Sequence, residues 1–86
     1  MTNDELLLRV RAVISTLFEV PEAEVTGDTA AGQLERWDSM GQLSLTLQLE
    51  QEFGVALLPE QVERMQDVRS VVSELAVALA GQNAAQ

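Results

Sequence analysis

The chain has 86 residues and a formal net charge of −9, and it contains no cysteine and no histidine. These absences exclude disulfides and thiolate metal sites, and they remove the commonest general base and the commonest transition-metal ligand. All five basic residues are arginines, which excludes catalysis by lysine as well. We therefore expect no metal site and no enzymatic activity from this chain alone.

The acidic charge and the lack of long apolar runs limit the partners and the compartment. A net charge of −9 disfavours nucleic acid and anionic membrane surfaces, and it favours proteins with basic patches. No apolar run approaches the ~18 residues of a membrane-spanning helix. The first residues are acidic and lack the basic segment of a secretory signal. We expect a monomeric cytoplasmic protein that binds neither nucleic acid nor membranes.

Aromatic residues make up only 3% of the chain, so the core must be mainly aliphatic. Aliphatic side chains suit packed helices better than a sandwich or a barrel. The length is that of one small domain. The sequence therefore predicts a single all-α domain over residues 1–86. We expect a small four-helix bundle of three main helices and a short third helix, with a long first loop.

The first helix is predicted from about residue 4 to residue 18. Thr2 and Glu5 have the spacing of a capping box at its start. The Val20-Pro21 pair ends it, because a residue before proline is disfavoured in the α region. Its apolar stripe consists of Leu6, Val10, Val13, Ile14 and Leu17.

The segment from residue 21 to residue 38 is predicted to be a loop. It is long for a compact domain, and loops of this length are usually functional or disordered. Val25 and Leu34 are its expected anchors to the core.

The second helix is predicted from Ser39 to Phe53, with Asp38 as its N-cap and Gly54 as a left-handed C-terminal cap. Helical spacing gives this helix two apolar faces. The face expected to enter the core carries Leu45, Thr46, Leu49 and Phe53, and the other face carries Met40, Leu43 and Leu47. Such a helix is either central and buried all round, or it exposes one face for docking. We favour docking, because so small a domain cannot cover a helix on every side.

The remaining chain predicts two further helices. Leu57 and Leu58 are expected to cross the core before a short third helix, Pro59–Met65. Asp67 is expected to cap a fourth helix over residues 68–80. Gly81 should end it and leave residues 82–86 as a frayed polar tail. The stripe of the fourth helix consists of Val68, Val71, Val72, Leu75 and Leu79.

Ser39 is the candidate functional residue, because it lies where the long loop becomes a helix. Free backbone N–H groups and the helix dipole favour a phosphate at this position. Catalysis by a serine nucleophile needs an adjacent base, and only carboxylates are present. An Asp-Ser pair before a helix is also an ordinary cap. The pair alone does not decide between a cap and a site of attachment.

The combination of motifs resembles the acyl carrier protein family. Asp38-Ser39-Met40 matches the Asp-Ser-Leu attachment motif of that family, and residues 50–54 match the Glu-x-x-Phe-Gly sequence that ends its second helix. The similarity also includes Val20-Pro21 and the run Met65-Gln66-Asp67-Val68. It covers residues 4–80.

The resemblance implies that Ser39 accepts a 4′-phosphopantetheine arm from coenzyme A, transferred by a separate phosphopantetheinyl transferase. Asp38 and Met40 would flank the attachment point. The terminal thiol of the arm would carry an acyl or aminoacyl group as a thioester to loading, acyl-transfer or condensing enzymes. Partner docking is predicted at Met40, Leu43, Leu47, Glu50, Glu60 and Glu63.

Departures from the family pattern favour a specialised pathway over housekeeping fatty-acid synthesis. Fatty-acid carriers usually have acidic residues two and five positions after the serine, where this chain has Gly41 and Ser44. Trp37 before Asp-Ser resembles discrete carriers of specialised pathways, and Asp-Ser-Met-Gly is also similar to D-alanyl carrier proteins. Docking should therefore depend on apolar side chains more than on charge.

Several alternatives stay open at the level of sequence. Trp37 either packs the loop onto the bundle or forms a lip beside the arm, and Arg36 either pairs with the phosphodiester or stays solvated. Glu60, Glu63 and Asp67 form either a second docking patch or a solvated face with a helix cap. The chain itself is either a carrier or a carrier-fold adapter that binds proteins without the arm. Its cargo either enters between the helices or stays in solvent.

Overall fold

Four α-helices and one 3-10 helix make up the part of the chain that this computed structural model describes, the backbone of residues 1–84 and the side chains of residues 1–81. The elements are α1 (Asn3–Phe18), η1 (Glu22–Glu24), α2 (Ser39–Phe53), α3 (Pro59–Arg64) and α4 (Val68–Ala84). The predicted all-α architecture with a short third helix is confirmed. No helix within residues 1–84 is both long enough and apolar enough to cross a membrane.

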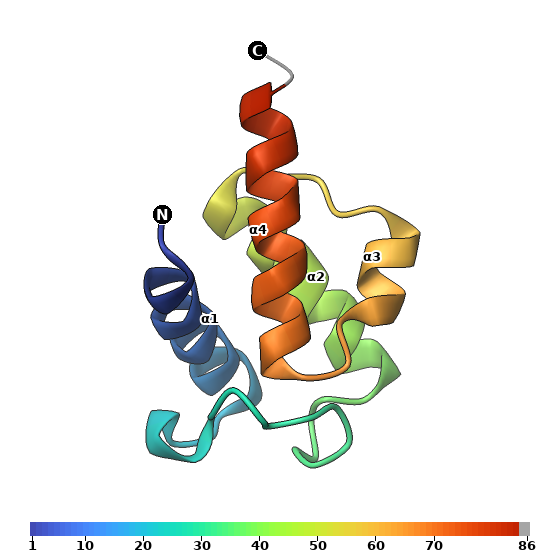
Figure 1. The fold of residues 1–86 in the computed structure, drawn as a ribbon. Coiled ribbons are helices and arrows are strands. Elements are labelled where there is room, and N and C mark those ends of the chain that lie inside the picture. Colours follow the sequence, from blue (N-terminus) through green and yellow to red (C-terminus); the bar gives the residue numbers. More distant parts are fainter. Residues whose placement is uncertain (85–86) are drawn as a thin grey trace.

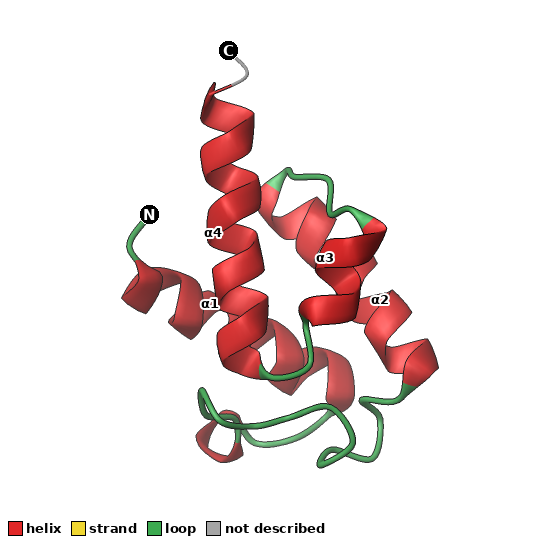
Figure 2. Cartoon of the chain, turned by 45° about the vertical axis from the view of Figure 1, so that its right-hand side comes forward, coloured by secondary structure: helices red, strands yellow, loops and turns green. Residues whose placement is uncertain are grey.

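The long helix α4 forms the centre of the bundle. It packs against α1 on one side and α3 on the other, and α1 also contacts α2 (Figure 1). The first loop runs beneath one end of the bundle, past the start of α4, before it reaches the start of α2 (Figure 2). Backbone hydrogen bonds fasten it there: the N–H of Val68 donates to the carbonyl of Thr29, and the N–H of Ala31 donates to the carbonyl of Gln66.

The helix starts and ends are formed locally, as the sequence predicts. Thr2 and Glu5 make the predicted capping box, in which each side chain accepts a hydrogen bond from the other residue's backbone N–H at 3.2 Å. The second helix occupies the predicted residues, and Gly54 forms its C-cap in the left-handed region with φ 65°. Asp67 caps α4, because its Oδ1 accepts from the backbone N–H of Ser70 at 2.7 Å.

The core is aliphatic and contains the predicted stripes of α1, α2 and α4. Val25 anchors the first loop in it as predicted, whereas Leu34 and three members of the predicted helix stripes, Leu17, Phe53 and Leu79, are only half-buried. Its members are Leu6, Val10, Val13, Ile14, Phe18, Val25, Trp37, Leu45, Leu49, Val55, Leu57, Met65, Val68, Val71, Val72 and Leu75.

The predicted burial of Leu58 is wrong. Leu57 is buried, but the side chain of Leu58 is 54% exposed. Leu58 is the extended N-cap residue of α3, and neighbouring side chains of an extended segment point in opposite directions. Directing Leu57 inward therefore directs Leu58 into solvent.

The predicted ends of the last two helices also need correction. Helix α3 ends at Arg64, one residue early, and Met65 is its C-cap. Helix α4 continues through Gly81 to Ala84, so residues 82–84 are not a frayed tail, while residues 85–86 lie outside the described chain. A glycine costs a helix only about 1 kcal/mol relative to alanine. The helix-forming residues on both sides of Gly81 offset that cost.

Candidate functional site

Ser39 is the first residue of α2, and its side chain is exposed. Asp38 caps the helix as predicted: its Oδ1 accepts from the N–H of Gly41 at 2.9 Å, and its carbonyl accepts from the N–H of Gln42 at 2.8 Å. The first two N–H groups of the helix, those of Ser39 and Met40, have no intrahelical partner. Among the described residues, nothing hydrogen-bonds to the Ser39 hydroxyl. The site therefore offers a free hydroxyl beside free amide donors.

The electrostatics at the start of α2 suit an anion. The positive end of the helix dipole lies here, and the first turn after the Asp38 cap contains no acidic residue. Arg36 does not turn toward Ser39, since its guanidinium forms an exposed ion pair with Glu19, Nη1 to Oε2 at 2.5 Å. The structure thus favours the interpretation of Arg36 as a surface arginine. The backbone amides remain as the hydrogen-bond donors to an anion.

Glycine is required at position 41 by the approach of the loop. A Cβ atom there would lie 1.9 Å from the Arg36 carbonyl oxygen and 3.0 Å from Cε1 of Phe18. A separation of 1.9 Å is far inside van der Waals contact, and the atom concerned belongs to the loop backbone. Any side chain at position 41, including an acidic one, would therefore require the loop at Arg36 to move. Sequence reasoning noticed only the missing acid at Gly41. The structural reason is the contact between the loop and the first turn of α2.

Trp37 packs the loop onto the bundle, which is the first of the two interpretations that the sequence left open. Its side chain is 1% exposed and stacks on Phe18, with ring centroids 5.9 Å apart and an interplanar angle of 24°. Its Nε1–H donates to Oε1 of Gln42 at 2.7 Å. The residue directly before Asp38 is therefore fixed by packing on one side and by a hydrogen bond on the other.

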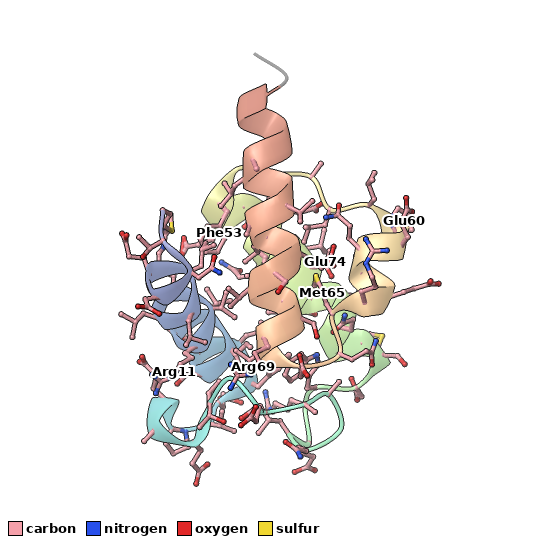
Figure 3. All side chains as sticks on the ribbon, in the orientation of Figure 1. Arg11, Phe53, Glu60, Met65, Arg69 and Glu74 are labelled. Carbon is pink, nitrogen blue, oxygen red and sulfur yellow. The ribbon has the colours of Figure 1, made fainter. Side chains whose placement is uncertain are left out.

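Two arginines fasten the earlier part of the same loop. The Arg11 guanidinium on α1 donates to the carbonyls of Val25 and Glu22, at 2.5 and 3.0 Å. On α4, Arg69 forms an ion pair with Asp28 at 3.2 Å. Figure 3 shows both arginines at the end of the bundle where the loop passes. The loop that precedes Ser39 is thus held to α1 and α4 rather than hanging free.

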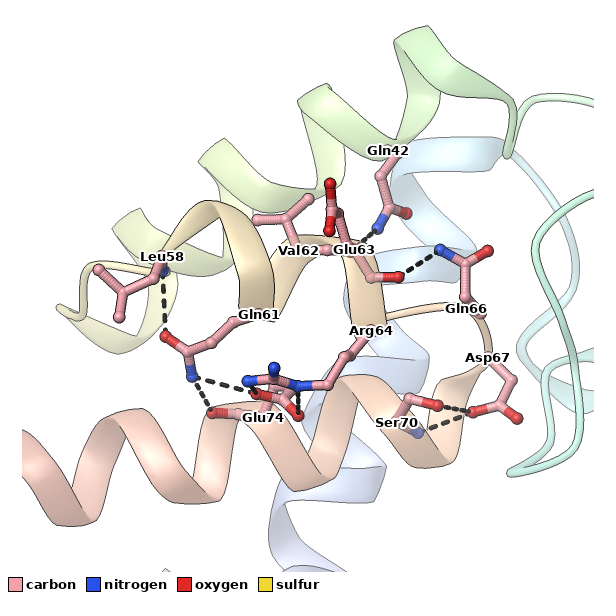
Figure 4. Close-up of polar contacts among 10 residues, drawn as sticks. All are labelled: Gln42, Leu58, Gln61, Val62, Glu63, Arg64, Gln66, Asp67, Ser70 and Glu74. Atoms are coloured by element: carbon pink, nitrogen blue, oxygen red, sulfur yellow. Dashed lines mark hydrogen bonds and ion pairs between the residues drawn. The ribbon is translucent and has the colours of Figure 1, made fainter.

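Gln42 is a site residue that sequence reasoning missed. Its Nε2 donates to the carbonyls of Val62 and Met65, each at 3.0 Å, so that it joins α2 to the end of α3 (Figure 4). The available signal was its spacing, since Gln42 lies one turn before Leu45 and Thr46 on the core-facing side of α2. A polar residue on that side must find partners inside the fold.

An open hollow of about 470 Å³ lies beside Ser39, between the first loop, the start of α2 and α3. Ala31, Trp37 and Val62 contribute to its walls, which are largely apolar. Its polar lining residues are Asp38, Ser39, Gln42, Glu63 and Gln66. The predicted docking residue Glu63 is therefore close to the candidate attachment site.

The two faces of α2 separate as predicted. Leu45 and Leu49 are fully buried, whereas the second face is open to solvent. The exposed side chains of that face are Met40 at 75%, Leu43 at 59% and Leu47 at 55%, and together they form what we call the docking stripe.

The predicted acidic docking residues have different surroundings. Glu60 and Glu63 are exposed on α3, and Figure 3 shows Glu60 at its outer side. Glu50 is half-buried, and its Oε2 accepts a 2.9 Å hydrogen bond from the backbone N–H of Leu57. Its carboxylate therefore stabilises the α2–α3 connection, whereas docking by these three residues remains a prediction.

A polar network joins α3 to α4 behind the site (Figure 4). Arg64 pairs with Glu74, Nε to Oε2 at 3.0 Å, and this hydrogen bond holds the pKa of the Glu74 carboxyl below its usual value. Hydrogen bonds from the hydroxyl and the backbone N–H of Ser70 likewise lower the pKa of Asp67. Asp67 thus serves as a helix cap. No group of three or more acidic side chains in the described residues is arranged to hold a metal ion.

Comparisons with known proteins agree with this geometry. Residues 8–75 match the model of a family described as a phosphopantetheine attachment site. The chain is 36% identical over 75 residues to the acyl carrier protein of Petrotoga mobilis, and the alignment covers 87% of this chain and 88% of that protein. It is 28% identical over 72 residues to the acyl carrier protein of Thermosynechococcus vestitus, covering 84% and 89% of the two chains. With the acyl carrier protein of Treponema pallidum strain Nichols the identity is 36% over 67 residues, covering 77% and 85%.

Proposed function

The chain belongs to the acyl carrier protein family, which makes it a carrier with covalently attached 4′-phosphopantetheine rather than an enzyme, and we propose that it holds this group on Ser39. The observation that carries the proposal is the free, exposed hydroxyl of Ser39 at the first position of α2. The amides of Ser39 and Met40 would donate to the phosphodiester, and Asp38 would hold the helix start in place. When bound, the arm supplies a thiol, which this cysteine-free chain lacks.

The other serines lack this combination of properties. The hydroxyl of Ser15 donates to the carbonyl of Val20 at 2.6 Å, and that of Ser70 is bonded to Asp67. Ser44 and Ser73 are exposed but lie inside α2 and α4, where the backbone amides are used by the helix. Ser44 is therefore the matched control for Ser39.

Acyl carrier proteins work with phosphopantetheinyl transferases and with acyl-handling enzymes. In this chain the docking stripe is the proposed contact surface for them, because it begins one residue after Ser39 and is open to solvent. Glu60 and Glu63 would add charged contacts at its α3 side. A basic or apolar patch on the partner fits such a surface.

The pathway is proposed to be a specialised one. Support comes from the start of α2, where Gly41 and Ser44 occupy positions that are usually acidic in fatty-acid carriers. Position 41 cannot be acidic here because a Cβ atom would overlap the loop backbone at Arg36. The stacking of Trp37 on Phe18 holds that part of the loop in place. Recognition of α2 would then depend mainly on its apolar side chains.

Intact-protein mass spectrometry tests the attachment site. Wild type, Ser39→Ala and Ser44→Ala are each incubated with coenzyme A and a broad-specificity phosphopantetheinyl transferase. We expect wild type and Ser44→Ala to gain the mass of one phosphopantetheine, and Ser39→Ala to gain none. A folded Ser39→Ala variant that still gains the arm would refute the assignment. The mass of the protein from its native host then identifies any cargo.

A further inference from the structure

We propose that Gln42 closes the line of contact between α2 and α3, the α2–α3 seam, so that cargo on the arm stays outside the helix bundle. The inference rests on attachment of the arm at Ser39. It names the class of cargo that this carrier suits, a short or polar acyl group rather than a long alkyl chain.

Gln42 uses all parts of its side-chain amide in the seam. Both carbonyls that accept from its Nε2, those of Val62 and Met65, lie at the end of α3, at 3.0 Å each. Its Oε1 accepts the indole N–H of Trp37 at 2.7 Å. Figure 4 shows the Gln42 side chain reaching from α2 to the end of α3. Parting α2 from α3 here would break both hydrogen bonds from Nε2, while the bond to Trp37 stays on the α2 side.

The position of Gln42 makes it the barrier between Ser39 and the core. It lies less than one turn after Ser39 on α2, and both residues line the hollow of about 470 Å³. The residues on its inner side are fully enclosed, since Leu45 and Met65 both have 0% exposure. Thr46, one turn further along α2, is also buried and donates its hydroxyl to the Gln42 carbonyl at 2.8 Å. A chain that enters from Ser39 through the seam must displace Gln42 first.

The hollow beside Ser39 lies outside the seam and is open to solvent. Its walls are largely apolar, with Ala31, Trp37 and Val62 among them, so it could cover one side of an alkyl chain but not enclose it. A long alkyl cargo outside the bundle would therefore stay partly in contact with water, whether it lies in this hollow or on the docking stripe. A short or polar cargo has no apolar surface that needs burial.

The test compares two cargoes on the whole protein. The transferase loads wild type from acetyl- or octanoyl-coenzyme A, and intact mass verifies each loaded form. Two properties are then measured: the rate at which hydroxylamine cleaves the thioester, and the amide resonances of Leu45 and Met65. For wild type we expect rates within about twofold of each other and unchanged core resonances, because neither cargo is buried. Slower cleavage of the octanoyl form together with shifted core resonances would overturn the proposal.

Matched variants of two glutamines that line the same hollow isolate the role of Gln42. Gln42→Leu removes the bridge and should allow entry, so its octanoyl thioester should be cleaved about tenfold or more slowly than its acetyl thioester. Gln66→Leu makes the hollow equally apolar but leaves the bridge intact, because Gln66 donates to the Glu63 carbonyl at 2.7 Å within the α3 segment. It should behave as wild type does. The assignment to Gln42 is refuted if the octanoyl thioester is cleaved equally slowly in both variants. It is also refuted if a folded Gln42→Leu variant cleaves its octanoyl thioester as fast as its acetyl thioester.

The wild-type comparison stands even where a variant does not fold. A failure of the proposed function looks different, since a wild-type chain that gains no mass on Ser39 shows that no arm is attached. Slow hydroxylamine cleavage of the octanoyl thioester on a loaded wild-type chain contradicts the closed seam but leaves attachment at Ser39 standing. The two results are therefore separable in one experiment.

Discussion

The indole N–H of Trp37 donates a 2.7 Å hydrogen bond to the side-chain oxygen of Gln42, across the residue that we assign as the attachment site. One partner ends the first loop and the other lies in the first turn of α2, so the bond fixes the backbone on both sides of Ser39. Stacking of Trp37 on Phe18 extends this constraint to the end of α1. The position of the Ser39 hydroxyl therefore depends on a packed aromatic residue that has no chemical role of its own.

Replacing Trp37 separates its hydrogen bond from its packing. Trp37→Phe keeps a ring near Phe18 but leaves Oε1 of Gln42 without its donor, and we expect a loss of about 1–2 kcal/mol in the free energy of unfolding. Trp37→Ala should cost about 3–5 kcal/mol, because a large buried side chain is lost. Urea unfolding followed by circular dichroism measures both. A Trp37→Phe variant as stable as wild type would mean that the hydrogen bond contributes nothing.

Two glycines of helices should respond in opposite directions to the same change. Alanine normally stabilises a helix interior relative to glycine by about 1 kcal/mol. Gly81→Ala should show a gain of up to that size, since nothing lies within 4 Å of the added methyl group. Gly41→Ala should instead lose about 1–3 kcal/mol, because its methyl group would overlap the Arg36 carbonyl. Thermal unfolding of the two variants side by side checks this, and a stabilised Gly41→Ala would contradict the close approach of the loop.

A charge placed in the docking stripe should slow loading by the transferase without destabilising the fold. Leu43→Asp places a charge in the middle of the exposed stripe and should lower kcat/KM for loading by the transferase about tenfold or more. Leu58→Asp is the control, because Leu58 is exposed to a similar degree, 54% against 59% for Leu43, but lies outside the stripe, at the start of α3. Initial rates of arm transfer, read by mass, distinguish the two variants. Equal rates would place the transferase contact elsewhere.

Acid should destabilise the fold through Asp67 and Glu74. Hydrogen bonds from Ser70 and Arg64 lower the folded pKa of these carboxyls, so the unfolded chain binds more protons as the pH falls. Their contribution to stability is complete above the unfolded pKa, about 4, and is lost as the pH falls through the folded pKa. Urea unfolding between pH 7 and pH 3 should therefore show a loss of stability only in the acid part of the range.

Asp67→Asn tests that assignment. Asparagine is also a good N-cap, so stability at pH 7 should fall by less than about 1 kcal/mol. The loss of stability in acid should become smaller, because residue 67 no longer titrates. An unchanged acid slope in Asp67→Asn would show that other groups control the acid response. Asp67→Ala, which removes both the cap and the charge, should be less stable than Asp67→Asn at every pH.

Features that depend on local sequence were predictable from the chain. The capping box of Thr2 and Glu5, the bounds of α2 and the cap at Gly54 are formed by residues within a few positions of one another. The exposure of Met40, Leu43 and Leu47 followed from helical spacing and from the small size of the domain. Ser39 as the candidate site followed from its place at a helix start, in a chain without histidine, lysine or cysteine.

Features that depend on contacts between distant segments were not predictable. The bridge from Gln42 to Val62 and Met65 spans twenty or more positions, and nothing local indicates which carbonyls an amide will meet. The predictions at Leu58 and Gly81 were wrong for a different reason, because residue type alone does not say which way a side chain turns or whether a helix continues through a glycine.

By itself, then, the sequence determined the four helices, the Asp-Ser pair at the start of α2 and the two faces of that helix, because spacing and capping act within one or two turns. Only the tertiary structure decided that Gly41 must lack a side chain, that Arg36 turns to Glu19, and how Gln42 joins α2 to α3. Those outcomes depend on how closely the first loop and α3 approach α2. Such distances arise from packing of the whole core, which no short stretch of the chain encodes.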